Sequence, residues 1–237
     1  MHVFQTTFTL YLHQDLPDYA ALTTLGRFLD IVLCKTQEGI AFHTENKYKH
    51  YSFNSLHPTE HSKTYYRKKC YSWQVRTVSM ELAELLSNQL IHTKYEYFDV
   101  VDAQLKILPK HSIKKLYSIT PCIIKMEATD ENGSPYWQNI ITEEEYLKRI
   151  KVNLVKKYNQ FSGTSLSEDF QFFDSVEVIN RQPIACAYKG VKLLGDKLDL
   201  YISDNQTAQE LAYFALGTGI LEMNSRGYGF VNDKWSK

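Results

Sequence analysis

Residues 215–231 have the sequence ALGTGILEMNSRGYGFV, which contains four of the ten glycines of the chain, Gly217, Gly219, Gly227 and Gly229. Glycine permits a positive φ and lets the backbone approach a ligand closely. These glycines follow a predicted helix and lead into a predicted final strand, whereas the glycines of a dinucleotide-binding fingerprint follow a strand and open a helix. Two interpretations remain. The segment is either a helix stop followed by a bulged strand, or a loop whose N–H groups point at phosphate oxygens.

Together with the residues before it, this segment contains the elements of one α+β unit. A turn at 132–135 and two capping boxes, Thr142 with Glu145 and Thr207 with Glu210, punctuate it. The predicted order is a strand at 114–127, a helix at 142–158, strands at about 171–186 and 188–203, a helix opened by Thr207, and a last strand that includes Tyr228, Phe230 and Val231. The inner face of the helix at 142–158 carries Leu147, Ile150 and Leu154.

The first half of the chain has the same order of elements. The predicted elements are a strand at 2–12, a helix at 17–33, strands at 49–57 and 63–78, a helix at 80–91 with Ser79 as its N-cap, and a strand at 95–107. Strand, helix, strand, strand, helix, strand is the ferredoxin-like pattern. The sequence therefore predicts an α+β protein of two tandem ferredoxin-like (RRM-like, βαββαβ) domains, an N-terminal one at 1–110 and a C-terminal one at 111–237.

The bulk composition is typical of a folded, soluble protein. The chain of 237 residues is 43% hydrophobic and 23% charged. It has no run of 18 apolar residues, so no membrane partner is expected, and its start lacks the basic leader of a signal peptide. The four cysteines form no CxxC pair, which favours free thiols in the cytoplasm over a disulfide or zinc framework.

The charges are balanced in number but not in position. There are 27 basic and 27 acidic residues, and a net charge of zero argues weakly against a nucleic-acid partner. Residues 43–76, however, contain seven Lys or Arg and four His against two acids, and residues 78–105 contain five acids against one lysine. A basic face is therefore compatible with the neutral total, because phosphate responds to the local field.

The order of features around the glycine segment resembles that of the CRISPR repeat-processing endoribonucleases. A helix, GxG, a short spacer and GxGFV lie near the end of a tandem ferredoxin-like chain. Residues 185–195, ACAYKGVKLLG, resemble the family's glycine-bearing hairpin before the last helix. Phe28-Leu29 followed by residues 41–54, AFHTENKYKHYSFN, is similar to its first helix, active-site histidine and second strand. The resemblance thus spans most of the chain.

The resemblance implies RNA cleavage without a metal or other cofactor. The 2′-hydroxyl of the RNA attacks the adjacent phosphorus, which gives a 2′,3′-cyclic phosphate and a 5′-hydroxyl end. A histidine suits proton transfer near neutral pH, and a lysine or tyrosine suits stabilisation of the developing charge. We expect His43 to be the base and Lys49 its partner, with Lys47 as the rival lysine and Tyr48 as a further candidate, if residues 43–49 form a loop.

The sequence offers other histidines for the role of base and no pattern typical of a metal site. His50 and His57 are the nearest alternatives to His43. No HExxH motif is present, and the isolated acidic pairs lack a histidine at ligand spacing, so no metal site is expected.

RNA binding is separable from cleavage. The residues expected to contact RNA are Gly217, Gly219, Arg226, Gly227 and Gly229, together with Arg181 and Lys189 on the predicted hairpin strands. The expected partner is CRISPR repeat RNA or precursor guide RNA. The resemblance further implies delivery of the product to a CRISPR effector complex, and a homodimer is left open.

Two other functions compete with repeat cleavage. The first is an RNA-binding module without catalysis, either an inactive relative or a tandem RRM-like protein; the absence of the RRM signature K/R-G-F/Y-G/A-F-V-x-F/Y argues against an ordinary RRM. The second is a small-molecule enzyme or scaffold, because the ferredoxin-like fold hosts many functions. That interpretation predicts no RNA affinity.

Overall fold

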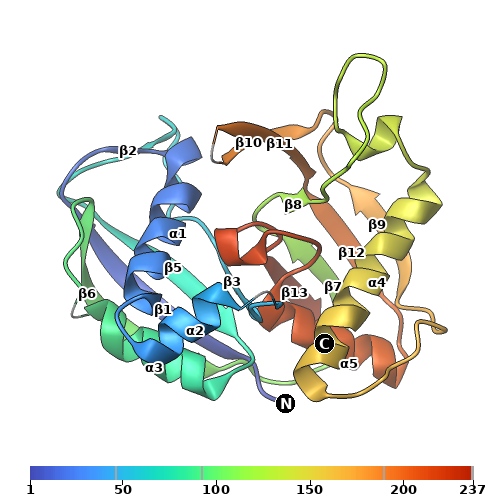
Figure 1. Cartoon of the computed structure of the whole chain (residues 1–237), viewed down its shortest axis with the longest axis horizontal. Coiled ribbons are helices and arrows are strands. Elements are labelled where there is room, and N and C mark those ends of the chain that lie inside the picture. Colours follow the sequence, from blue (N-terminus) through green and yellow to red (C-terminus); the bar gives the residue numbers. More distant parts are fainter. Residues whose placement is uncertain (46, 92, 189, 236–237) are drawn as a thin grey trace. The chain divides into compact units, whose positions relative to one another are not determined.

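The computed structural model describes residues 1–45, 47–91, 93–188 and 190–235, without the side chains of His43 and Ala187. The chain forms two compact units, each with its own sheet and helices (Figure 1). The first unit consists of Met1–Leu108 and Ser225–Gly227, and the second of Pro109–Asn224 and Tyr228–Lys237. Among the described residues, no helix is long and apolar enough to cross a membrane.

The first unit is built on a four-stranded antiparallel sheet. Its strands are β1 (Phe4–Leu12), β3 (Tyr51–Phe53), β5 (Cys70–Thr77) and β6 (Phe98–Ile107), in the spatial order β3-β5-β1-β6. Helices α1 (Asp18–Leu33) and α3 (Met80–Ile91) make the crossovers. This is the strand order of the ferredoxin-like fold, so the predicted fold class is confirmed for this half.

The core of the first unit gathers on the face of the sheet that α1 and α3 cover. Side chains at alternate positions of β1 point inward, and α1 presents an apolar face at helical spacing. Trp73 of β5 is fully buried, and the ring centroids of Phe8, Phe28 and Phe53 lie 5.3, 6.4 and 5.8 Å from its own. Strands and helix therefore share one aromatic cluster.

Three short elements of this unit were not predicted. They are α2 (Gln37–Thr44), β2 (Leu16–Pro17) and β4 (Thr64–Tyr65), the last two of which pair with each other. The predicted strand at 63–78 was wrong in its continuity, since it is interrupted between β4 and β5. Lys68 has a φ of 64°, outside the range of a strand, and its N–H donates to the carbonyl of Leu12 at 2.7 Å.

The second unit repeats the same topology. Its main sheet contains β7 (Ile113–Ser118), β9 (Phe173–Val178), β12 (Leu198–Ile202) and β13 (Val231–Trp235), in the order β13-β7-β12-β9. The crossovers are α4 (Glu143–Ser162) and α5 (Gln206–Thr218). A second sheet, in the order β10-β11-β8, adds β8 (Cys122–Ile123), β10 (Ile184–Tyr188) and β11 (Val191–Asp196). Two 3₁₀ turns lie at Trp137–Asn139 and Asn224–Arg226. The tandem ferredoxin-like prediction is thus confirmed.

The predicted strands at 114–127, 171–186 and 188–203 were wrong in their continuity, because each is split between the two sheets. The last two breaks share a cause. The side chain of Asn180 accepts from the N–H of Lys197 at 2.6 Å and donates to Asp196 at 2.7 Å. Asp196 is fully buried and also accepts from the side chains of Tyr136 and Trp137, at 2.9 and 2.7 Å. These hydrogen bonds hold the residues after β9 and the β11–β12 junction together around the buried carboxylate of Asp196, where the main sheet ends.

The predicted helix caps were right at two helices and wrong at a third. Thr142 caps α4 by accepting from the N–H of Glu145 at 3.2 Å, and Ser79 caps α3 by accepting from the N–H of Leu82 at 3.1 Å. The capping box that was predicted at Thr207 is absent, since α5 is capped by Asn205. Asn205 lies two residues before Thr207, and asparagine is as good an N-cap residue as threonine.

Candidate functional site

His43 lies in α2, so the predicted loop at 43–49 begins only after Thr44. The condition that residues 43–49 form one loop is therefore not met. Phe42, the residue before it, packs against the core of the first unit, with its ring 6.2 Å from that of Tyr51. The histidine thus sits on a short helix that is anchored by its neighbour.

The start of α2 is fixed by two residues. The side chain of Thr36 accepts from the N–H of Gly39 at 3.0 Å and caps the helix. A side chain at Gly39 would overlap the carbonyl oxygen of Leu33, the last residue of α1. Only glycine therefore allows α2 to follow α1 this closely, and this junction sets the direction of the helix that carries His43.

Lys49 holds the other end of α2. Its ammonium donates to the carbonyl oxygens of Phe42 and Glu45, the latter at 2.5 Å, and lies 5.2 Å from the centre of the Phe42 ring. A cation is favourable at the C-terminus of a helix, where carbonyls lack intrahelical partners. The Phe42 carbonyl belongs to the peptide bond with His43. Lys49 Nζ is therefore held beside the backbone of the predicted base.

The two neighbours of Lys49 in the prediction lie differently. Lys47 forms an ion pair with the carboxylate of Glu45, and its side chain is 58% exposed. Tyr48 is exposed, with its ring 6.5 Å from that of His50. Of the two lysines, Lys49 is thus the one that contacts the peptide bond leading into His43.

The positive charge of Arg226, which belongs to the same unit, acts on the ammonium of Lys49. Burial lowers the pKa of the Lys49 ammonium, Glu45 opposes this, and the positive charge of Arg226 lowers the pKa further. Arg226 forms an ion pair with Asp30 of α1, at 2.6 Å between Nη1 and Oδ2. The first unit therefore gathers a predicted catalytic lysine and a predicted RNA-binding arginine in one electrostatic environment.

The glycines do not form an open cradle. Gly217 is a buried residue of α5, and Gly219 ends that helix with a φ of 72°. A side chain at Gly219 or Gly229 would collide with the side-chain amide of Asn224, at 2.6 and 2.8 Å. Gly227 has a φ of 86° and contacts Phe53, leaving no room for a side chain. The predicted helix stop at Gly219 is therefore present.

We call residues 219–229 the glycine loop. The N–H groups of Gly219, Ile220, Glu222 and Gly229 donate to protein carbonyls at 2.8–3.0 Å. These four amides are therefore engaged within the protein. The half-exposed residues of the loop are Glu222, Met223, Ser225 and Arg226.

A residue that the sequence prediction missed stands at the centre of this loop. Lys157 of α4 is only 3% exposed, and its ammonium donates to the carbonyls of Gly219 and Leu221 and to Oδ1 of Asn224, at 3.2, 2.7 and 2.6 Å. A signal was present in the sequence. Lys157 lies three residues after Leu154, on the inner face that was predicted as apolar.

The remaining predicted contacts fall around the β10–β11 hairpin. Arg181 is exposed in the connection between β9 and β10, not on a strand as expected. Lys189 lies outside the described residues.

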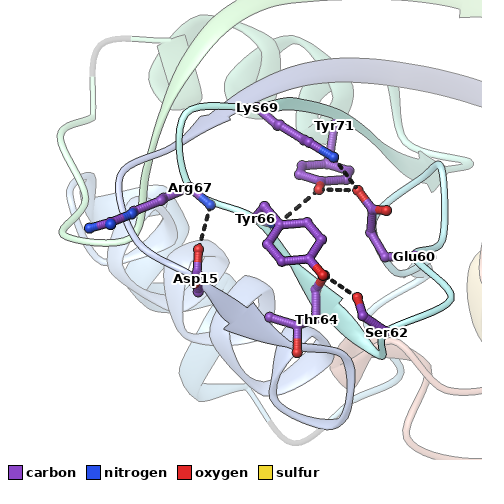
Figure 2. Close-up of polar contacts among 8 residues, drawn as sticks. All are labelled: Asp15, Glu60, Ser62, Thr64, Tyr66, Arg67, Lys69 and Tyr71. Atoms are coloured by element: carbon purple, nitrogen blue, oxygen red, sulfur yellow. Dashed lines mark hydrogen bonds and ion pairs between the residues drawn. The ribbon is translucent and has the colours of Figure 1, made fainter.

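The basic run Arg67-Lys68-Lys69 lies beside two acids, Asp15 and Glu60 (Figure 2). The backbone N–H of Arg67 donates to Asp15 at 2.7 Å, and Lys69 pairs with Glu60 at 3.2 Å. Tyr71 also donates to Glu60, at 2.6 Å. Glu60 thus offsets one of the positive charges of this segment.

Of the two alternative histidines, His50 directly follows Lys49, and His57 lies further along the chain in the first unit. The backbone of His57 pairs with Ser72, and His50 adopts a φ of 48°. Within the part of the chain that the structure describes, no group of three or more His, Cys, Asp or Glu side chains is placed to hold a metal ion.

Two ferredoxin-like units in one chain, with a glycine loop between the last helix and the last strand, define the class of tandem ferredoxin-like proteins. A family model described as "CRISPR associated protein Cas6, C-terminal" matches residues 103–232. The match covers more than half of the chain, so the chain belongs to the Cas6 family of CRISPR-associated proteins. The resemblance stated from the sequence is thereby confirmed.

Solved structures of similar fold span nearly the whole chain. A structure described as "CRISPR associated protein Cas6" is 18% identical, with a TM-score of 0.70, over 98% of this chain and 99% of its own. Another, "An RAMP protein binding different RNA substrates", is 13% identical, with a TM-score of 0.74 over the same shares. A Cas6 product complex is 14% identical, with a TM-score of 0.64, over 99% of this chain and 100% of its own. At these identities the similarity shows the fold. The search of curated proteins gave no match.

Proposed function

We propose that this protein is a metal-independent endoribonuclease that cleaves CRISPR precursor transcripts within the repeat and so yields guide RNAs. The observation that carries the proposal is the family match over residues 103–232. The similarity in fold to a Cas6 product complex and to a protein that binds RNA substrates supports it.

The proposed reaction is an internal transfer at one phosphodiester. His43 removes the proton of the 2′-hydroxyl, the 2′-oxygen bonds to the adjacent phosphorus, and the bond from phosphorus to the 5′-oxygen breaks. The leaving oxygen takes up a proton, which leaves a 2′,3′-cyclic phosphate and a 5′-hydroxyl. An imidazole suits the first step because it exchanges protons near neutral pH.

Lys49 is the proposed partner of His43. Its ammonium contacts the carbonyl of Phe42 and therefore lies near the backbone of His43. It is only half-buried, so it is able to exchange a carbonyl acceptor for a phosphate oxygen and to stabilise the negative charge that develops there. Lys47 and Tyr48 remain the alternatives for this role.

The proposed RNA contacts are less central to the reaction. Arg226 lies in the electrostatic environment of Lys49 and is proposed to bind a phosphate. Gly217, Gly219, Gly227 and Gly229 are proposed to act by shaping the glycine loop, and Arg181 and Lys189 by adding charge near the β10–β11 hairpin. Delivery of the product to a CRISPR effector complex and a homodimeric state stay predictions.

The test is cleavage of an end-labelled repeat RNA in excess chelator, with wild type, His43→Ala and, as matched controls, His50→Ala and His57→Ala. We expect His43→Ala to lower the cleavage rate by about 10²-fold or more with little change in RNA affinity, since general acid–base catalysis contributes on that order. An RNA with one 2′-deoxy sugar at the cut site should survive.

Other outcomes would overturn parts of the proposal. If wild type binds the RNA but never cuts it, the protein is an RNA-binding module. If His43→Ala cuts as fast as wild type while one control does not, the family function stands and that control names the base. Cleavage of the deoxy RNA would reject attack by the 2′-hydroxyl.

A further inference from the structure

Lys157 and the glycine loop form a closed hydrogen-bonded unit. A lysine ammonium has three N–H donors, and the three donors of Lys157 meet Gly219, Leu221 and Asn224. The lysine comes from α4, whereas its acceptors all follow α5 in the sequence (Figure 1). One buried side chain therefore ties the loop to a separate helix.

Asn224 extends this contact to both arms of the loop. Its side-chain oxygen accepts from Lys157, and its side-chain nitrogen donates to the carbonyls of Ile220 and Tyr228 at 2.9 and 3.0 Å. Gly219 and Gly229 leave the space that this amide fills. The glycines thus allow the loop to close around Asn224, and Lys157 fixes Asn224 in place.

The loop needs such fixing because its backbone is unfavourable. Leu221 and Met223 have φ values of 56° and 61°, a region that residues with a side chain rarely adopt. Conformations of this kind persist only where surrounding contacts determine them. Lys157 supplies one such contact directly, because the carbonyl of Leu221 is one of its acceptors.

The charge of Lys157 is sensitive to pH near neutrality. Burial lowers the pKa of this ammonium to about 7, while the charged or ionisable groups that face it, Glu222 from the loop and Cys122 from β8, act in the opposite direction. A neutral amine keeps only two N–H donors. Loss of the proton therefore leaves one of the three acceptors without its donor.

We propose that Lys157 is a positioning residue, whose three hydrogen bonds hold the glycine loop in the conformation that binds RNA. The proposal rests on the proposed function, in which this loop contributes to RNA binding. Lys157 itself is buried and does not touch the RNA. Its effect is transmitted through Asn224 and the backbone between Gly219 and Leu221.

The first test needs no RNA. Hydrogen–deuterium exchange of peptides that cover 219–230 is compared in wild type, Lys157→Met and Lys156→Met. Lys156 is the matched control, because it is the exposed neighbour on the same helix. We expect the amides of Ile220, Glu222 and Gly229 to exchange roughly tenfold faster or more in Lys157→Met, as for loss of a charge-assisted hydrogen bond, and to be unchanged in Lys156→Met. Equal protection in all three proteins would overturn the proposal.

A second variant guards against misfolding. Should Lys157→Met fail to show a cooperative thermal transition, Asn224→Ala removes the same link from the loop side. It is expected to raise loop exchange by a similar factor, while peptides from β7 and β12 keep their protection. Protection of the loop that survives in a folded Asn224→Ala would also contradict the proposal.

The second test compares the affinity of wild type and Lys157→Met for labelled repeat RNA at one pH. Lys157→Met should bind several-fold more weakly than wild type, because the loop is no longer held in its binding conformation. Equal affinities of the two folded proteins would reject the positioning role of Lys157 in binding. Absence of binding by wild type would instead reject the proposed function, and the exchange experiment would still decide whether Lys157 orders the loop.

Discussion

Lys49 and Lys157 make the same kind of contact at two places in the molecule, and they differ in burial. Each ammonium donates to backbone carbonyls, those of Phe42 and Glu45 in one case and those of Gly219 and Leu221 in the other. Lys49 is half-buried at a helix end, whereas Lys157 is buried within the second unit. An accessible lysine is able to change acceptors and meet a substrate, and a buried one is confined to holding structure.

The largest expected effect is on the rate of RNA cleavage, which substitution of Lys49 should lower far more than substitution of Lys47. Lys49→Met is expected to lower the rate of RNA cleavage by about 10²–10³-fold, as for loss of one preorganised donor to a developing oxyanion. Lys47→Met, which removes an exposed ion pair with Glu45, should change it by less than about threefold. Single-turnover rates with saturating protein measure this. A larger loss in Lys47→Met would transfer the role to Lys47.

The next effect concerns the backbone that Lys157 holds. A side chain at Gly229 would overlap the carbonyl oxygen of Ile220, whereas one at Gly133 meets nothing within 4 Å, although both glycines have positive φ. Gly229→Ala should therefore cost about 3 kcal/mol or more of unfolding free energy, from strain and overpacking together. Gly133→Ala should cost only about 1 kcal/mol, from its φ alone.

Urea unfolding followed by circular dichroism checks this difference, since both glycines belong to the second unit. Equal destabilisation by the two alanines would mean that the loop relaxes around a side chain at Gly229. The closed packing around Asn224 would then not be required for the fold.

The fold was largely predictable because its main signals are local. The alternation in β1 and the helical spacing in α1 follow from residues that are near one another in sequence, and both elements lie within about two residues of their predicted bounds. The splitting of the strands around β9 to β12 was not predictable. It depends on Asn180 meeting Asp196 and Lys197, a contact between residues 16 and 17 positions apart.

The candidate site was only partly predictable for a similar reason. The basic and aromatic segment after Ala41 drew attention to His43 and Lys49, but α2 was missed, because it is fixed by the lack of space at Gly39 against α1. The glycines of the loop are compatible, from sequence alone, with a helix stop or with phosphate contacts. Their packing around Asn224 depends on a lysine 67 residues earlier, which only tertiary structure brings there.

A smaller effect should appear in the pH dependence of stability. The pKa of Lys157 is about 7 in the folded protein, below the value of about 10.4 in an unfolded chain. Between these values the unfolded state binds more protons, so the free energy of unfolding rises with pH, by up to about 1.4 kcal/mol per pH unit. The destabilisation from the buried charge is fully present below pH 7.

Lys157→Met should lack this contribution, and Lys156→Met should keep it. Urea unfolding at pH 7, 8 and 9 gives the three slopes. Identical slopes in wild type and Lys157→Met would mean that the three acceptors keep the ammonium charged throughout this range. Lys157 would then differ from Lys49 in its burial but not in its charge.

The smallest effect concerns Arg226, whose ion pair with Asp30 is intermediate in exposure, with the two side chains 22% and 30% exposed. A double-mutant cycle of Arg226→Ala and Asp30→Ala should give a coupling of about 0.5–1 kcal/mol in stability, typical of a partly exposed pair. If Arg226 also binds a phosphate, Arg226→Ala should reduce the salt dependence of RNA binding by about one ion, whereas Asp30→Ala should not. A measurable coupling without any change in the salt dependence would place Arg226 with Lys157, as a cation that holds the protein and not the RNA.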